Sequence, residues 1–304
     1  RNKVFLMLWN FDDEVFFDST SKYYAQFTDY ILTASYVEMH RYKGMGLDSD
    51  CYISSYNTKE YKMSNKDTVY DVTFVGGHKR GRRKEQIEFL QKNGVSVDTF
   101  GGDSKNGSVS KEKMIEIFTT SKINLNFTGT MNPKWANLDE FSIQTKQLKG
   151  RIIESAISGG FILTEYVYGL ENVFNIGEEI DTFRNQDELL EKVTFYLNNE
   201  SERKKMSEKC FARAQDYDMK KTLTSLIATI KLKSANRKHN NIQTIVIDRS
   251  FKKRYVTYRL VRFVARHIKK LEFKLAFDEV VYLAKNFNLN IFSIIKSIFM
   301  VKKI

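Results

Sequence analysis

Between residues 70 and 217, short apolar runs alternate with longer segments in which apolar residues recur at helical spacing. The short runs predict strands at 70–77, 95–102, 122–127, 161–166 and 178–183. The longer segments, with Ser110 as an N-cap and Gly94 as a stop, predict helices at 82–94, 110–121, 148–158, 187–199 and 201–217. Strands that alternate with helices of this length predict a parallel sheet covered by helices on both faces.

Ligands of such sheets bind beyond the carboxyl ends of the strands. This rule selects four places before any chemistry is considered: Gly76-Gly77, Gly101-Gly102, the segment after Phe127, and Thr164-Glu165.

The flanking segments have a different character. Residues 1–65 carry weaker strand and helix signals, which predict part of a second α/β domain. The chain begins without a methionine and enters a strand within three residues, so we interpret it as cut from something longer, with part of this first domain absent. The predicted organisation is a partial α/β domain (1–65), a Rossmann-like parallel-sheet domain (66–225) and a basic helical extension (226–304).

Composition supports more than one domain, because 304 residues with 42% hydrophobic side chains can bury a large core. The net charge of +12 is uneven: from residue 231 to the end there are 18 Lys and Arg against four acidic residues, so the rest of the chain is slightly acidic. Cys51 and Cys210 are far apart without metal-ligand spacing, which predicts unpaired thiols in a reducing cytosol.

The basic extension has three interpretations. Segment 251–277 reads as one helix with Arg259, Arg262 and Arg266 on one side and apolar residues on another, which suits an anionic membrane surface. Nucleic acid is not expected, because no reader motif accompanies the charge. Ordinary solvated helices packed on the body are the third interpretation. No run approaches the roughly 20 apolar residues that span a bilayer, so we expect a cytoplasmic protein, peripheral on the inner membrane face under the first interpretation.

The turn FVGGHKRGRRKE could receive an anion. Gly76 and Gly77 let the backbone pass close to a ligand, and the helix that begins near Arg82 would direct free N–H groups to the same place. Five cations crowd this turn: Lys79, Arg80, Arg82, Arg83 and Lys84. The turn is neither a Walker loop nor G-x-G-x-x-G, and a solvated basic turn fits equally well.

The stretch LKGRIIESAISGGFILTEY raises the same pair of alternatives. Arg151 and Glu154 share a helix face, so they could form a plain surface ion pair. Alternatively, Lys149 and Arg151 face phosphate oxygens while Glu154 accepts two hydrogen bonds from a ribose diol. Spacing alone fits both.

Residues 149–214, from KGRIIESAISGGFILTEY through LENVF, IGEEI and QDELL to the final helix, resemble the C-terminal domain of the spore-maturation-protein-like glycosyltransferases. That group belongs to the GT-B enzymes with family-1/4-like C-terminal domains. YDVTFVGG followed by Arg82, and SKINLNF, extend the resemblance to about residues 70–225, and more loosely to 1–60.

The resemblance implies roles for particular residues. Glu154 would bind the ribose of a nucleotide-sugar, while Arg151, with Arg82 or Lys149, would balance the diphosphate. Gly76 and Gly77 would let the loop approach the diphosphate, and Thr164 and Glu165 would lie near the donor. The commoner family-4 pattern has a second glutamate eight residues before the ribose-binding one, where this chain has Lys146.

The candidate catalytic residues are His78 and Asp13, with Asp12 as an alternative to Asp13. No metal site is predicted, since Asp48-Ser49-Asp50 has Asp-x-Asp spacing but lies in the wrong half of the chain. Fixed cations and helix N–H groups can stabilise a departing diphosphate without a metal, so we predict metal-independent transfer without a cofactor.

The predicted function is transfer of a sugar from a nucleotide-sugar to a glycan or lipid-linked acceptor in surface polysaccharide or spore-coat biosynthesis. Two alternatives stay open at this point: a non-catalytic scaffold with the same fold, and a sugar-nucleotide epimerase.

Overall fold

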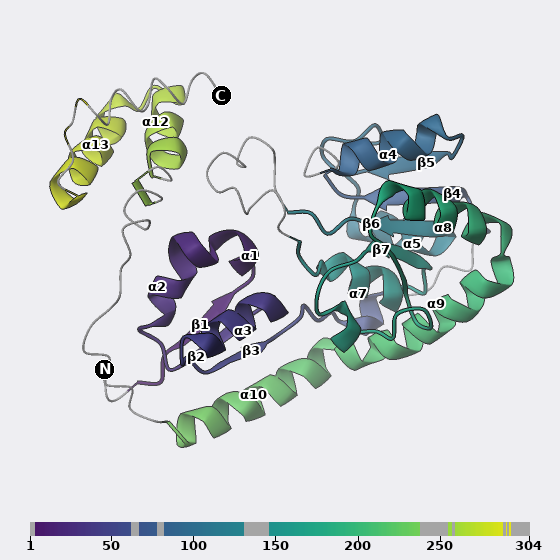
Figure 1. The fold of residues 1–304 in the computed structure, drawn as a ribbon, viewed down its shortest axis with the longest axis horizontal. Helices are drawn as coiled ribbons and strands as arrows, with labels where there is room; N and C mark the ends of the chain where they lie inside the picture. The colour runs from purple at the N-terminus through teal and green to yellow at the C-terminus, as the bar shows by residue number, and fades with distance from the viewer. Residues whose placement is uncertain are drawn as a thin grey trace.

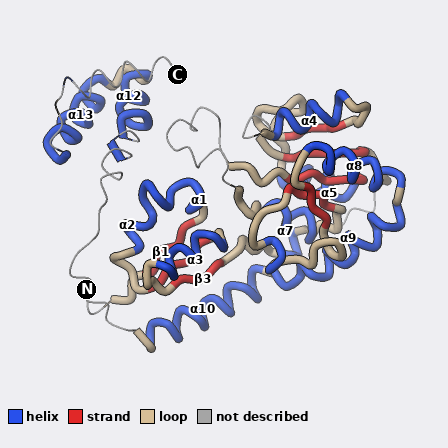
Figure 2. Tube along the Cα trace, in the orientation of Figure 1, coloured by secondary structure: helices blue, strands red, loops and turns tan. Residues whose placement is uncertain are grey.

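The computed structural model describes residues 4–61, 67–77, 82–130, 146–237, 255–256, 259–287, 290 and 292; it leaves out the side chains of Ser19, Val261 and Arg262. Within these residues the chain is a mixed α/β protein with two separate parallel sheets, as the hydrophobic pattern predicts (Figures 1 and 2).

The N-terminal sheet has three parallel strands in the order β1-β2-β3, namely Met7–Asn10, Tyr30–Thr33 and Ser49–Cys51. Leu32 pairs with Trp9 on one side and with Asp50 on the other. The helices of this part are α1, α2 and α3, which span Asp13–Phe16, Lys22–Ala25 and Tyr36–Gly44, with a π-helical turn at Phe17–Ser21 between the first two.

The larger sheet has five parallel strands in the order β5-β4-β6-β7-β8. In chain order, β4 to β8 span Tyr70–Val75, Val97–Phe100, Ser121–Asn126, Ile162–Glu165 and Asp181–Phe183. Every strand predicted from 70 to 183 is therefore confirmed, with bounds shifted by one to three residues.

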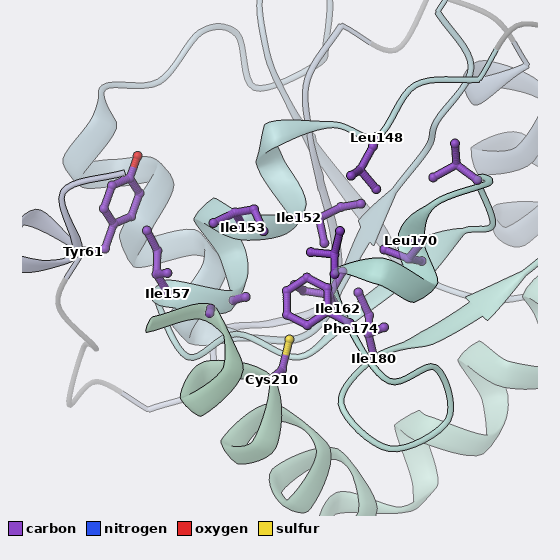
Figure 3. Packing of buried hydrophobic residues seen from close by; sticks show 14 of the residues in the cluster. Tyr61, Leu148, Ile152, Ile153, Ile157, Ile162, Leu170, Phe174, Ile180 and Cys210 are labelled. Atoms are coloured by element: carbon purple, nitrogen blue, oxygen red, sulfur yellow. The ribbon is translucent and has the colours of Figure 1, made fainter. Parts of the chain in front are cut away.

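Helices cover both faces of this sheet because each carries one apolar face. Helices α4 and α8 pack with Phe74, Leu125 and Leu163 on one side. Helices α5, α7 and α9 cover the other side, where Ile157 and Cys210 lie in a cluster with Phe174 (Figure 3). The helices α4, α5, α7, α8 and α9 span Arg83–Lys92, Lys111–Thr120, Gly150–Ile157, Gln186–Asn198 and Glu200–Ala214.

Two chain segments connect the two sheets, and they touch one another. Tyr56 N donates to Tyr217 O at 3.2 Å, and Met219 N donates to Tyr56 O at 2.9 Å. Short 3-10 turns, Thr58–Glu60 and Gln215–Tyr217, flank these contacts. The crossing point is thus a small hydrogen-bonded junction.

The long helix α10, Met219–Ala235, runs from this junction under the N-terminal sheet (Figure 1). Its buried Leu226 clusters with Tyr30 and Leu32 of β2. Lys233 Nζ lies 2.6 Å from Asp48 Oδ1, and Arg237 Nε lies 2.9 Å from Asp29 Oδ1. The boundary predicted at 225/226 falls within this helix, and two cations of the predicted extension are paired with acids of the N-terminal part.

The segment 251–277, predicted as one helix, is divided into several helical pieces in the structure. Its residues 251–254 and 257–258 lie outside the described part. A π-helical turn, Leu260–Val264, continues into α12, Ala265–Lys269, and α13 spans Phe273–Phe287. The helix breaks at Leu271, which adopts φ +60°, so the two helices fold back as a hairpin. The prediction of a single helix was wrong because the apolar pattern continues across the break.

Helix packing also changes the role assigned to Arg259. Its guanidinium forms two hydrogen bonds with Glu279 of α13, at 2.5 and 2.6 Å. Arg259 therefore holds the hairpin together rather than facing outward with Arg266.

Cys51 and Cys210 are free thiols. No helix among the described residues is long and apolar enough to cross a membrane.

Candidate donor-binding cleft

A cleft of about 580 Å³ opens at the carboxyl ends of β4, β5 and β6, against the segment that leaves the N-terminal sheet. This is the edge that the strand-end rule selects. The lining residues come from the five-stranded sheet and its loops, from α4 and α7, and from the segment that follows β3: Ser54, Tyr56, Phe74, Gly76, Gly77, Arg83, Gly102, Asp103, Asn126, Phe127, Lys149, Gly150, Arg151 and Glu154.

The glycines at the strand ends are required by close approach. A Cβ on Gly76 would lie 2.5 Å from Nη1 of Arg151, and a Cβ on Gly101 would lie 2.5 Å from the carbonyl oxygen of Gly76. Gly76 N donates to Phe100 O at 2.6 Å, which ties the β4 and β5 ends together. The cleft floor at these glycines is therefore bare backbone, with no side chain between it and a ligand.

Arg151, in the first turn of α7, is held in this floor. Its Nη1 donates to Val75 O, while its Nε is buried without a hydrogen-bond partner among the described residues. Burial lowers the pKa of Arg151, and the nearby charge of Glu154 opposes that shift. A buried guanidinium with an unused donor is costly unless an anion completes it. The alternative of a plain surface ion pair does not describe this side chain.

Glu154 lies one turn further along α7 and interacts with two tyrosines of the connecting segment. Tyr61 Oη donates to Glu154 Oε1 at 3.0 Å. The Tyr56 and Tyr61 rings pack edge to face, with centroids 5.6 Å apart. Burial, with the negative charge of Glu154, raises the pKa of both tyrosines. Both phenols therefore stay protonated and can donate, and one carboxylate oxygen of Glu154 is held in place by Tyr61.

Lys149 precedes α7 and lines the same cleft beside the first-turn amides. Its Nζ donates to Gln147 Oε1. Tyr56 Oη covers the helix start, since a Cβ on Gly150 would lie only 2.1 Å from it. Lys149, Arg151 and the N-terminal amides of α7 form one positively polarised end of the cleft.

Arg82, predicted to face the donor, is outside the cleft. Its side chain is 85% exposed and pairs with Glu85. The neighbouring Arg83 lines the cleft instead, with Nη1 on Gly77 O at 2.7 Å and Nη2 on Gly129 O at 2.8 Å. Neighbouring residues differ in direction by about 100° around a helix, so Arg83 and not the predicted Arg82 lines the cleft at this turn.

Thr164 and Glu165 lie at the end of β7 as predicted, but both are used structurally. Thr164 is fully buried and accepts a hydrogen bond from Asn126 Nδ2 at 2.8 Å. Glu165 Oε2 accepts from Thr128 N and Oγ1, and its Oε1 lies 3.1 Å from Lys146 Nζ. Lys146, at the place of the second glutamate, therefore neutralises Glu165.

The N-terminal part meets this region through Gln147. Its Nε2 donates to Phe11 O at 2.8 Å, to Asp12 Oδ1 at 3.1 Å and to Glu14 Oε2 at 3.4 Å. Burial raises the pKa of Glu14 to about 8, with Glu38 and Asp12 adding to the shift and Lys149 opposing it. Asp13 is buried and accepts a hydrogen bond from Tyr42 Oη at 3.1 Å, so it belongs to the first domain's interior.

Two candidate assignments remain. His78 lies outside the described residues. Among the described residues, no group of three or more His, Cys, Asp or Glu side chains is gathered as metal ligands. Asp48 and Asp50 instead bind Lys233 and Tyr30 Oη. Sequence reasoning missed Tyr56, Tyr61 and Glu14. The two tyrosines lie in a segment without a helical or strand pattern, and Glu14 follows Asp12 and Asp13, from which the sequence did not distinguish it.

Part of the chain is similar in sequence to a known protein family. Residues 80–228 match the family model described as glycosyl transferase-like. No curated protein matches the chain significantly by sequence.

Solved structures are similar in fold at low identity. Sucrose-phosphate synthase from Thermosynechococcus elongatus is 12% identical with a TM-score of 0.53, covering 69% of this chain and 60% of its own. HepE from Anabaena, in complex with UDP and glucose, is 10% identical with a TM-score of 0.52, covering 68% of this chain and 64% of its own. TarM is 12% identical with a TM-score of 0.51, covering 68% of this chain and 44% of its own.

The chain thus spans about half to two thirds of the length of these structures. The chain has the mixed α/β architecture of the GT-B glycosyltransferases, and the matched family model covers most of its five-stranded domain together with the start of α10.

Proposed function

We propose that this chain transfers a sugar from a nucleotide-sugar donor and that the cleft at the end of the five-stranded sheet binds the donor. The observation that carries the proposal is the partly buried Arg151, whose Nη1 lies beside the Gly76 backbone and whose Nε has no hydrogen-bond partner among the described residues. UDP in the structurally similar HepE supports a nucleoside diphosphate as the ligand class.

In this proposal the diphosphate lies between the Gly76-Gly77 turn and the first turn of α7. Lys149, Arg151 and the free amides of α7 offset its charge, which grows as the bond between the sugar's anomeric carbon and the diphosphate oxygen breaks. Glu154 accepts from the ribose hydroxyls with the oxygen that Tyr61 leaves available. We propose that no metal is needed, because these groups already provide positive charge at the leaving group.

The acceptor, a glycan or lipid-linked sugar, is proposed to approach from the N-terminal part. The segment 11–14 faces the donor domain across Gln147, so acceptor hydroxyls would meet the donor there. The role in surface polysaccharide or spore-coat biosynthesis stays a prediction from the resemblance to the spore-maturation-protein-like group.

Calorimetric titration of the full chain with UDP, GDP, ADP, CDP and TDP, in buffer with a metal chelator, tests donor binding. At 100 times its Kd, a cognate diphosphate should add about 2.7 kcal/mol to the free energy of unfolding. Arg151→Gln should weaken both the diphosphate and inorganic pyrophosphate roughly 10- to 100-fold, as expected for a charged hydrogen bond. Glu154→Gln should weaken the nucleoside diphosphate alone, since pyrophosphate has no ribose.

Arg82→Gln is the matched control, because this arginine adjoins the same turn and points into solvent. It should bind like the wild type. Failure of every nucleoside diphosphate to bind, or unchanged affinity in Arg151→Gln with an unchanged fold by circular dichroism, would refute the donor site. Binding without release of diphosphate from any nucleotide-sugar would support the scaffold, and conversion of the free donor sugar without acceptor would support an epimerase.

A further inference from the structure

The helical hairpin near the C-terminus has two apolar faces, and one of them is uncovered. The inner face forms a small core of Leu260, Val264, Ala276, Val280 and Leu283. In Figure 1 this hairpin, α12 and α13, stands apart from both sheets.

The outer face is a continuous apolar strip. Phe273, Phe277 and Val281 recur every four residues on α13, and the first two are 61% and 63% exposed. Leu271, at the tip of the turn, is 74% exposed and adjoins the start of the strip. Large apolar side chains exposed in a row are unusual on a surface that faces only water.

Cations border this strip at its tip. Lys269, Lys270 and Lys274 are exposed and lie within five residues of Leu271 and Phe273. The nearest acid, Glu272, lies 2.7 Å from His267 and also interacts with the charges of Lys270 and Arg266. Residues 266–274 nevertheless keep a net positive charge, because four cations stand against this one acid. A tip with aromatic and aliphatic side chains ringed by lysines has the composition of a surface that lies in the headgroup region of a bilayer.

We propose that the hairpin tip docks this protein on an anionic lipid surface, with Leu271, Phe273 and Phe277 entering the acyl boundary and Lys269, Lys270 and Lys274 facing lipid phosphates. A second copy of the chain is disfavoured as the partner of this surface. In a symmetric contact the three lysines of one copy would lie near the same three lysines of the other and repel them. The long stems of lysine let their amines reach phosphates while the apolar residues insert.

The hairpin differs from the other basic parts in this respect. Lys233 of α10 and Arg237, two residues beyond this helix, are paired with Asp48 and Asp29. Arg259, at the base of the hairpin and away from its tip, is paired with Glu279. Lipid binding is therefore assigned to the tip and not to the positive charge of the whole extension. The inference does not depend on sugar transfer.

Vesicle flotation of the full chain tests the docking surface. Neutral phosphatidylcholine vesicles are compared with vesicles that also contain phosphatidylglycerol, at 50 and 500 mM salt. The wild type should bind the anionic vesicles and lose most of that binding at high salt. Lys269→Gln/Lys270→Gln/Lys274→Gln should weaken binding by roughly five-fold per lysine.

The apolar contribution is tested with Leu271→Ser/Phe273→Ser/Phe277→Ser, which should weaken binding at least ten-fold. The matched control is Phe195→Ser/Ile227→Ser, which removes two comparably exposed apolar residues from α8 and α10 and should change nothing. All these side chains are exposed, so thermal melting should show that each variant folds.

Three outcomes would overturn the proposal: wild-type protein that floats with neither vesicle, binding that ignores lipid charge and salt, or a triple-serine variant that binds like the wild type. A concentration-dependent dimer by sedimentation that disappears in the triple-serine variant, without lipid binding, would assign the strip to a second copy instead.

Discussion

Arg151, Arg83 and Glu154 are each held by a fixed partner from a neighbouring loop or strand end. Arg151 donates to Val75 O, Arg83 donates to Gly77 O and Gly129 O, and Tyr61 holds Glu154. Because these partners come from several loops, the side chains are oriented before any ligand binds, which lowers the entropic cost of binding.

The ionisation of Glu14 should have a visible effect on stability. Its folded pKa of about 8 is above the usual 4.5, so the folded state holds a proton that the unfolded state releases between these values. The contribution of Glu14 to the free energy of unfolding is therefore fully present below about pH 4.5, and it is lost as the pH rises to about 8. Glu14→Gln, which keeps the shape without the charge, should stabilise the protein by about 3 to 4 kcal/mol more at pH 9 than at pH 5.

Denaturant unfolding of the wild type and Glu14→Gln across this pH range measures the difference. Glu178→Gln, at an exposed carboxylate, serves as the control and should give parallel curves. A Glu14→Gln advantage that does not grow with pH would show that the carboxyl is already ionised or solvated in the folded state.

The residues of the cleft were only partly predictable for a geometric reason. Gly76, Gly77, Lys149, Arg151 and Glu154 line the cleft. The strand-end rule selected the two glycines, whereas the other three were selected through the family resemblance, because their spacing alone also fits a surface ion pair. Side-chain direction at the start of α4 depends on where the helix begins, which exchanges Arg82 for Arg83. Tyr61 reaches Glu154 across 93 residues of sequence, and no local pattern encodes such a contact.

At the scale of elements, strands and helices that carry their own apolar period were predicted well. The run Ile152 to Ile157 buries one helical face, and Phe161 to Leu163 is buried as a strand, so burial and pattern agree. The break at Leu271 was missed because neither glycine nor proline marks it, and the packing of Leu260 and Val264 on α13 stabilises the hairpin around the unusual backbone. Tertiary packing there overrides the continuous apolar signal.

The start of α10 depends on one carboxylate with two functions. Asp218 Oδ1 accepts from Lys220 N and Lys221 N as an N-cap, and its Oδ2 accepts from Thr58 Oγ1 at 2.8 Å. Asp218→Ala should cost about 1 to 2 kcal/mol for the cap, and it also releases Thr58 in the other connecting segment. Ser110→Ala removes a cap within the larger domain alone and should cost about 1 kcal/mol.

Hydrogen exchange separates the two effects of Asp218→Ala. Amides near Tyr56 and Met219, which bond across the junction, should lose protection in Asp218→Ala and keep it in Ser110→Ala. Equal protection of these amides in the two variants would mean that Asp218 is only a helix cap. Asp218→Asn, which retains an accepting oxygen for the cap, should recover part of the lost stability.

At the scale of the whole molecule, α10 joins two sheets that are otherwise connected through short segments. Its N-terminus lies at the junction beside Tyr56, and its body covers the N-terminal sheet through Leu226 against Tyr30 and Leu32. The ion pairs Lys233–Asp48 and Arg237–Asp29 fix its far end. The helix is therefore an integral layer of the N-terminal part, although it follows the larger domain in sequence.

This arrangement predicts that a charged side chain between α10 and the N-terminal sheet destabilises that sheet and not the five-stranded one. Leu226 is 8% exposed, so Leu226→Asp buries an unpaired carboxylate and should cost at least about 2 kcal/mol. The adjacent Ile227 is 52% exposed, so Ile227→Asp should leave stability nearly unchanged. In hydrogen exchange, Leu226→Asp should expose amides of β1, β2 and α10 while those of β4 and β6 keep their protection. An equal loss of amide protection in both sheets would show instead that the molecule unfolds as one unit and that the packing of α10 does not stabilise the N-terminal sheet separately.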